Sequence, residues 1–128
     1  DVLLTRKGTY GIAAIVDETV TDAVISSEIF RLVLHEDSAV LPEYLVEYLN
    51  SPIGQMQFQR IKTGAIMGHI GQDALAFLSI IVPPVDIQKR ICRKISDMRD
   101  TAGALRKQAV DDLDKAKKQV EIMILGEA

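Results

Sequence analysis

The sequence contains a single cysteine and no long hydrophobic run. Because Cys92 has no second cysteine to pair with, the chain cannot form an internal disulfide, and a cytoplasmic location is expected. No apolar run approaches the ~18–20 residues of a membrane-spanning helix, and we expect no signal peptide. We therefore expect no membrane partner.

Motifs for metal binding and catalysis are missing too. The sequence has no HExxH or CxxC spacing, so we expect no metal site and no cofactor. His35 and His69 stand apart from Cys92, which leaves no nucleophile–base pair. The stretch GAIMGHIG lacks the spacing of nucleotide-binding glycine loops. The sequence therefore predicts that the protein is not an enzyme, and an enzyme with an unrecognised site is the least favoured alternative.

Positive charge is scarce before residue 86. The whole chain has a formal net charge of −3, and residues 1–85 have five basic side chains against ten acidic ones, a net of −5. Residues 86–128 have ten basic and eight acidic side chains, a net of +2. Four of the five early basic residues stand close to Gly8 or Gly64: Arg6, Lys7, Arg60 and Lys62. Because an acidic surface repels phosphate, cations gathered at two loops indicate a local nucleic-acid contact.

These two loops are expected to converge on one side of the protein and to form the predicted DNA-binding site. Short donors and cations on a protruding turn suit contacts to phosphates and base edges, and arginine can bind guanine through two hydrogen bonds. The predicted DNA-binding residues are Arg6, Lys7, Thr9 and Tyr10 in the first loop and Arg60, Lys62, Thr63 and His69 in the second. Solvated turns with ordinary surface lysines are the alternative interpretation, and Tyr10 can equally be a core aromatic residue.

Secondary-structure signals predict an α+β fold. Residues 2–4 and 12–16 flank the turn TRKGTYG and are expected to form a β-hairpin, and the stretch AVISSEIFRLVLH has strand periodicity. Residues 78–82 predict a further, buried strand that Pro83 and Pro84 end. The sheet is therefore expected to be small and mixed or antiparallel.

Two short helices are predicted between these strands. One begins at Pro42, and the next is capped by Ser51 before Pro52. The expected buried side of the second helix is Ile53, Met56 and Ile61.

The last third of the chain predicts one long helix of coiled-coil type. Apolar residues recur there at spacings of three and four, with a 3-4-4 break near Ala109: Ile91, Ile95, Met98, Ala102, Leu105, Ala109, Leu113, Ala116, Val120 and Met123. A helix over residues 86–125 would be about 60 Å long at ~1.5 Å per residue, so its far half needs another helix as cover. A helix folded back on its own domain is the alternative.

The chain is thus expected to divide into a globular head, residues 1–85, and a long helix, residues 86–128. We expect the helix to mediate self-association. Gln88, in its first turn, is expected to face solvent or a partner. With Arg90 it is expected either to fix the helix to the head or to dock a partner subunit, and not to read bases. The predicted interface residues are Gln88, Ile91, Ile95, Met98, Leu105, Leu113 and Val120.

Several motifs occur together in a fixed order: DVLLTRKGTYGIAAIV, PEYLVEYLNSPIG, KTGAIMGHIGQDALAFLSIIVPPVDIQKRI and the helix behind them. Together they resemble the target recognition domain of type I restriction–modification specificity subunits. That family has a strand–turn–strand, a short helix, a glycine-rich loop and a Pro-Pro turn that leads into a spacer helix. Gln88 falls on the family's glutamine after that turn. The chain departs from the family pattern at Val82 and at residues 67–69.

The resemblance implies a subunit that selects the DNA sequence for a type I restriction–modification system. Residues 1–85 would read double-stranded DNA. The helix would set the distance between two half-sites and dock the methyltransferase subunits and, through them, the restriction subunits. No methyl transfer or cleavage is expected from this chain. Because family members have sequence before the first motif and carry two such domains, we expect half of a recognition domain with one spacer helix.

A coiled-coil adaptor is the alternative function. It would be a non-catalytic oligomerisation protein, the remnant of a specificity subunit, without DNA binding of its own. Charge reversal of the two basic loops separates the alternatives, because an adaptor's complexes would keep their DNA affinity.

Overall fold

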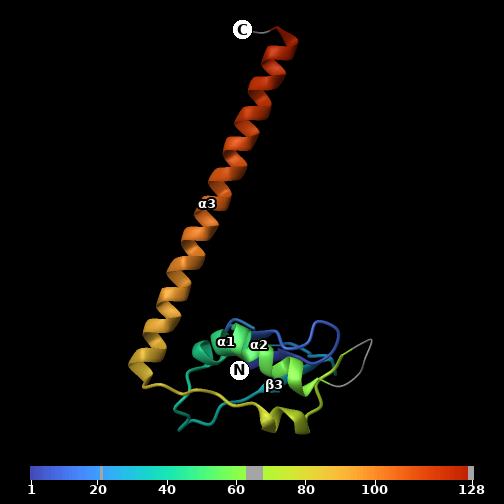
Figure 1. Ribbon diagram of the computed structural model, residues 1–128, viewed down its shortest axis with the longest axis vertical. Coiled ribbons are helices and arrows are strands. Elements are labelled where there is room, and N and C mark those ends of the chain that lie inside the picture. Colours follow the sequence, from blue (N-terminus) through green and yellow to red (C-terminus); the bar gives the residue numbers. More distant parts are fainter. Residues whose placement is uncertain (21, 63–67, 127–128) are drawn as a thin grey trace. The chain divides into compact units, whose positions relative to one another are not determined.

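The computed structural model describes residues 1–20, 22–62 and 68–126. The chain divides into two compact units, residues 1–92 and residues 93–128. The first unit holds a three-stranded sheet, two short helices and the first turns of a long helix (Figure 1). The second unit is the remainder of that helix. The predicted α+β class is confirmed, whereas the division after residue 85 stays a prediction.

The sheet is antiparallel throughout. It consists of β1 (Val2–Thr5), β2 (Ala13–Ile15) and β3 (Ile29–Leu32), in the order β2-β1-β3. In the predicted hairpin, Val2 pairs with Ile15 and Leu4 with Ala13. Because side chains alternate between faces, Val2 and Leu4 point to the same side, and both are fully buried. That face forms one wall of the core.

The turn between β1 and β2 requires glycine. Gly8 and Gly11 have φ angles of +67° and +80°, in the left-handed region that side chains disfavour. The Thr5 hydroxyl closes the turn by donating to the Thr9 carbonyl and accepting from the Ile12 N–H. A Cβ at Gly11 would lie 2.8 Å from the Phe58 ring. The hairpin therefore packs directly on the centre of the core.

We expect Gly11→Ala to lower the free energy of unfolding of the first unit by about 1–3 kcal/mol, because strain at positive φ adds to overpacking. Gly8→Ala is the matched control, since its φ is similar but its Cβ would meet nothing within 4 Å. Urea denaturation followed by tyrosine fluorescence measures the difference, since all three tyrosines lie in the first unit. Equal losses for the two variants would contradict the packing argument.

Two helices cover the buried face of the sheet. The first, α1 (Pro42–Asn50), and the second, α2 (Pro52–Ile61), each begin with proline, as predicted. The Ser51 hydroxyl accepts from the Gly54 N–H at 3.3 Å and caps α2. The core between sheet and helices contains Val2, Leu4, Ala13, Leu45, Leu49, Phe58 and Ile70.

The predicted buried side of α2 is wrong at Ile53 and Met56, whereas Ile61 is partly buried against the core. Ile53 and Met56 are about half exposed, at 49% and 52%, and the buried residues of α2 are Gly54 and Phe58. A Cβ at Gly54 would clash with the carbonyl oxygens of Tyr48 and Leu49. The glycine therefore lets α2 approach the end of α1, and that approach turns Phe58, one helical turn later, into the core.

The predicted strand at residues 78–82 is also wrong. A short 3-10 helix, η1 (Asp73–Phe77), is followed by a segment without a β-ladder, in which Ile81 is 63% exposed. Side chains of α1 and α2 bind its backbone instead. The Gln57 amide donates to the Ser79 carbonyl at 2.9 Å and accepts from the Ser79 N–H at 2.8 Å. The Tyr44 hydroxyl donates to the Ile81 carbonyl at 2.8 Å.

The long helix, α3 (Val85–Leu125), has 41 residues and is drawn as one unbroken helix (Figure 1). It continues through Gly103 and begins one residue before the predicted start. Among the residues that the structure describes, no helix is both long enough and apolar enough to cross a membrane.

Gln88 requires the largest correction. Its side chain is fully buried in the first unit, so it neither faces solvent nor belongs to the predicted partner interface. The amide donates to the carbonyls of Ala39 and Pro83, at 2.7 and 2.8 Å, and accepts from the Leu41 N–H at 2.9 Å. Gln88 therefore ties the start of α3 to the segment that precedes α1.

Candidate functional site

The first predicted DNA-binding loop continues the β1–β2 hairpin. The Thr5 N–H donates to the Ile12 carbonyl at 2.9 Å, and the Gly11 N–H donates to the Thr5 carbonyl at 2.8 Å. These bonds hold residues 6–10 between them as a short turn. Within it, the side chains of Lys7 and Thr9 are exposed, and that of Tyr10 is half-buried.

The described end of the second loop, residues 68–70, lies against the first loop. Lys7 and His69 form an antiparallel β-bridge, and the Ile70 N–H donates to the Arg6 carbonyl at 3.0 Å. Ile70 is fully buried in the core. The burial of Ile70 in the core thus holds the second loop beside the first, although the two loops are far apart in the sequence.

A surface hollow of about 560 Å³ lies where the two loops meet, lined by Lys7, Gly8, Glu28, Gly68 and His69. We call it the loop hollow. The Lys7 ammonium is 3.0 Å from a Glu28 carboxylate oxygen, and each side chain is about half exposed. Sequence reasoning missed Glu28, because it lies 21 residues from Lys7 and only the pairing of β1 with β3 brings them together.

Lys62 and Tyr10 connect the end of α2 to the same loops. The Lys62 ammonium lies 5.9 Å from the centre of the Tyr10 ring, within cation–π range. The Tyr10 hydroxyl donates to the Gln59 side-chain oxygen at 3.2 Å. A Cβ at Gly68 would clash with the Tyr10 ring. Tyr10 is therefore a bridge between the hairpin, α2 and the second loop, and its partly buried ring packs against the core.

Arg6 has structural contacts that its sequence position did not indicate. Its Nε donates to the Ile70 carbonyl at 3.3 Å, and its guanidinium lies 5.1 Å from the centre of the Phe30 ring. A third contact joins Nη1 to the Ser27 carbonyl at 3.5 Å. The arginine therefore helps to join the two loops, and its predicted role in reading bases stays a prediction.

Two other predicted DNA-binding residues, Arg60 and Thr63, are not among those that the structure brings together. Arg60 is exposed and lines a separate hollow of about 400 Å³ that includes Met56 and Phe77. Thr63 lies outside the described residues. The contacts of the described residues thus bring together Arg6, Lys7, Tyr10, Lys62 and His69, with Thr9 in the same turn.

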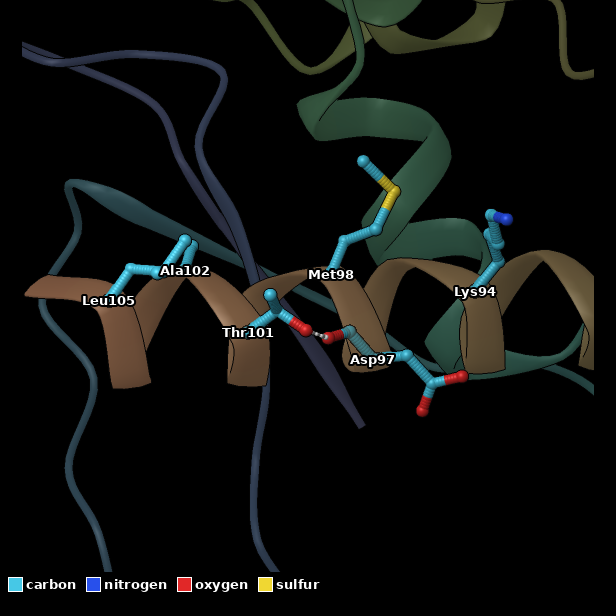
Figure 2. A pocket seen from close by; sticks show the side chains of 6 residues that line it. All are labelled: Lys94, Asp97, Met98, Thr101, Ala102 and Leu105. Carbon is cyan, nitrogen blue, oxygen red and sulfur yellow. Dashed lines mark hydrogen bonds between the residues drawn. The ribbon is translucent and has the colours of Figure 1, made fainter.

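Four of the predicted interface residues form an exposed apolar stripe on α3 within the second unit: Met98, Leu105, Leu113 and Val120. Met98 and Leu105 are each 62% exposed, and Leu113 and Val120 are more than half exposed. Figure 2 shows Met98, Ala102 and Leu105 projecting from the same side of α3. Ile95 is half-buried, and Ile91, in the first unit, is 37% exposed. The stripe matches the apolar residues at spacings of three and four that the sequence shows, which we call the seam. That a second helix covers it stays a prediction.

The surroundings of Cys92 disfavour nucleophilic chemistry at its thiol. Burial raises the pKa of the Cys92 thiol, and the nearby carboxylates of Glu47 and Glu43 raise it further. A thiol with a raised pKa has less of the reactive thiolate at neutral pH. Within residues 1–20, 22–62 and 68–126, no cluster of three or more metal-ligating side chains occurs.

A family model described as type I restriction modification DNA specificity domain matches residues 1–113. This match confirms the resemblance indicated by the ordered motifs, and it extends from the hairpin well into α3. No curated protein sequence matches the chain.

Proposed function

This chain belongs to the type I restriction modification DNA specificity family, and we propose that its first unit contacts double-stranded DNA through the two joined loops. The observation that carries the proposal is their contact: the bridge between Lys7 and His69 and the position of Lys62 over Tyr10 gather cations of an otherwise acidic unit. Gathered cations attract phosphate even where the net charge of the surrounding surface is negative.

The side chains of the loops suit different parts of a DNA duplex. Lys7 and Lys62 end in flexible ammonium groups, which act as point charges toward phosphates and carry no sequence information. Arg6 carries the planar donor fork that matches the guanine edge, provided that it exchanges its contacts with Ser27 and Ile70 for a base. In this proposal the lysines position the DNA and Arg6 reads it.

The chemistry on DNA belongs to partner subunits in this proposal. The chain would choose the sequence, and methyltransferase subunits, with restriction subunits bound through them, would act on it. We place the methyltransferase contact near the start of α3, where exposed Lys89 and Arg90 follow the Pro83–Pro84 turn. Buried Gln88 supports that surface from inside by fixing the turn.

We also propose that the stripe on α3 pairs with the same stripe of a second copy, antiparallel. Two-fold pairing is the commonest way for one chain to cover such a surface. It would place two DNA-reading units at opposite ends of a helical pair, as a two-part recognition site needs. The heptad spacing and the exposure of Met98, Leu105 and Leu113 support this pairing.

Lys7→Ala and Lys62→Ala, made separately, are expected to weaken DNA binding about tenfold near 0.1 M salt and to lower the salt slope by ~1. The measurement is a salt series with the chain assembled with a type I methyltransferase subunit, on duplexes that the wild-type complex selects from a random pool. Lys118→Ala, which removes the same charge from α3 opposite the seam, is the control. Unchanged slopes in both loop variants would favour the adaptor function.

A further inference from the structure

Glu28 is the acidic side chain of the loop hollow, and the backbone sets its position. Its carbonyl accepts from the Arg6 N–H at 2.8 Å, and its N–H donates to the Ser26 hydroxyl at 3.3 Å. These bonds place Glu28 directly beside the first loop, one residue before β3. The sheet register therefore sets the backbone position of Glu28, and its side chain lines the hollow beside Lys7.

The Lys7–Glu28 ion pair has little value as a stabilising contact. Both side chains are about half exposed, and exposed ion pairs contribute little to folding because water screens them. The pair instead changes the electrostatic character of the hollow. It neutralises one of the few cations available to phosphate, and it leaves a group that accepts hydrogen bonds but cannot donate them.

We propose that Glu28 is a specificity-determining residue that makes binding to non-target DNA unfavourable; this inference rests on the DNA-binding function proposed above. When Lys7 turns to a phosphate, it leaves Glu28. The free carboxylate is then repelled by the negative field of the duplex, unless a base presents an amino group to it. Carboxylates in DNA interfaces accept from the cytosine N4 amino group in this way.

Under this mechanism the free-energy cost of binding depends on the DNA sequence. On a target duplex, the Lys7–Glu28 pair is exchanged for a lysine–phosphate contact and a carboxylate–amino contact. On a non-target duplex only the first contact forms, and the carboxylate stays unpaired next to the DNA. The two glycines in the wall of the hollow, Gly8 and Gly68, carry no side chain that would keep a base edge from Glu28.

Glu28→Gln is the test, because the amide keeps the size of the side chain and removes its charge. We expect binding to sheared genomic DNA to strengthen about two- to fivefold, the range expected when an exposed ion pair is released. Binding to the selected target should not strengthen, so the ratio of target to non-target affinity falls. Selection from a random pool should show weaker preference for cytosine at one position.

Two further variants make the result specific. Compared with Lys7→Ala alone, Lys7→Ala/Glu28→Gln should still bind non-target DNA more tightly, because the carboxylate that the duplex repels is removed even when there is no lysine to release. Asp1→Asn removes the same charge from the Asp1–Arg31 ion pair, which lies outside the loop hollow. It should leave the affinity ratio unchanged.

Three results would overturn the inference. One is an unchanged ratio for Glu28→Gln with an unchanged base preference. Another is an equal fall of the ratio in Asp1→Asn, which would mean that only net charge matters. If instead the wild-type chain with its methyltransferase subunit binds neither duplex, the proposed function fails, and the inference fails with it.

Discussion

Gln88→Ala is expected to lower the free energy of unfolding of the first unit by about 2–4 kcal/mol, because it removes three partly buried hydrogen bonds of a fully buried side chain and opens a cavity. The exchange leaves the Leu41 N–H and the carbonyls of Ala39 and Pro83 without their partner. Partly buried backbone groups that lose their partner add to the cost of such a loss. The long helix would also lose a connection between its first turn and the rest of the unit.

Urea denaturation followed by tyrosine fluorescence tests this expectation. Because Tyr10, Tyr44 and Tyr48 all lie in residues 1–92, the signal reports the first unit and not the helical second unit. Gln72→Ala makes the same exchange at an exposed position of the first unit and should change stability by less than about 0.5 kcal/mol. A Gln88→Ala chain as stable as this control would contradict a structural role for the amide.

Leu105→Asp is expected to raise the dissociation constant of the proposed helix pair by about 100-fold or more. The reason is that pairing would bury a carboxylate against apolar side chains with no partner for its charge. Leu105 lies at the middle of the stripe and is 62% exposed in the single chain, so the substitution should not disturb the isolated helix strongly. Sedimentation velocity over a concentration series measures the change.

Ala104→Asp is the matched control for the helix pair. It adds the same charge one residue away, on a side of α3 that lies away from the seam. Circular dichroism should show both variants still helical. If the wild-type chain sediments as a monomer at high micromolar concentration while its helix is intact, or if both variants dissociate equally, then the stripe does not join two copies.

The basic loops could be found from sequence because each depends on a local signal. Charge and glycine cluster within a few residues at Arg6–Lys7–Gly8, and the structure indeed has a turn with positive φ there. How the two loops contact one another has no local signal in the sequence, because the contact depends on Ile70 entering the core. Glu28 could not be found at all, because no local pattern separates it from other surface glutamates.

Carboxamide side chains explain most of what sequence reasoning got wrong. An amide has a donor and an acceptor, so it can replace a neighbouring strand as a partner for backbone groups. Asn50 binds both the N–H and the carbonyl of Ala13, at 2.9 and 2.8 Å, on the free edge of β2. Gln57 binds Ser79 in the same way, which leaves residues 78–82 extended but outside any sheet. Gln88 does so for the segment before α1.

The amino-acid sequence by itself determined the elements whose causes are local. Proline and serine set the starts of α1 and α2, glycine set the hairpin turn, and apolar spacing set the length and stripe of α3. Only the tertiary structure decided which way α2 faces, whether residues 78–82 join a sheet, and whether Gln88 meets water. Those outcomes depend on close packing at Gly54 and on hydrogen bonds between groups distant in sequence, and no periodicity along the chain encodes either.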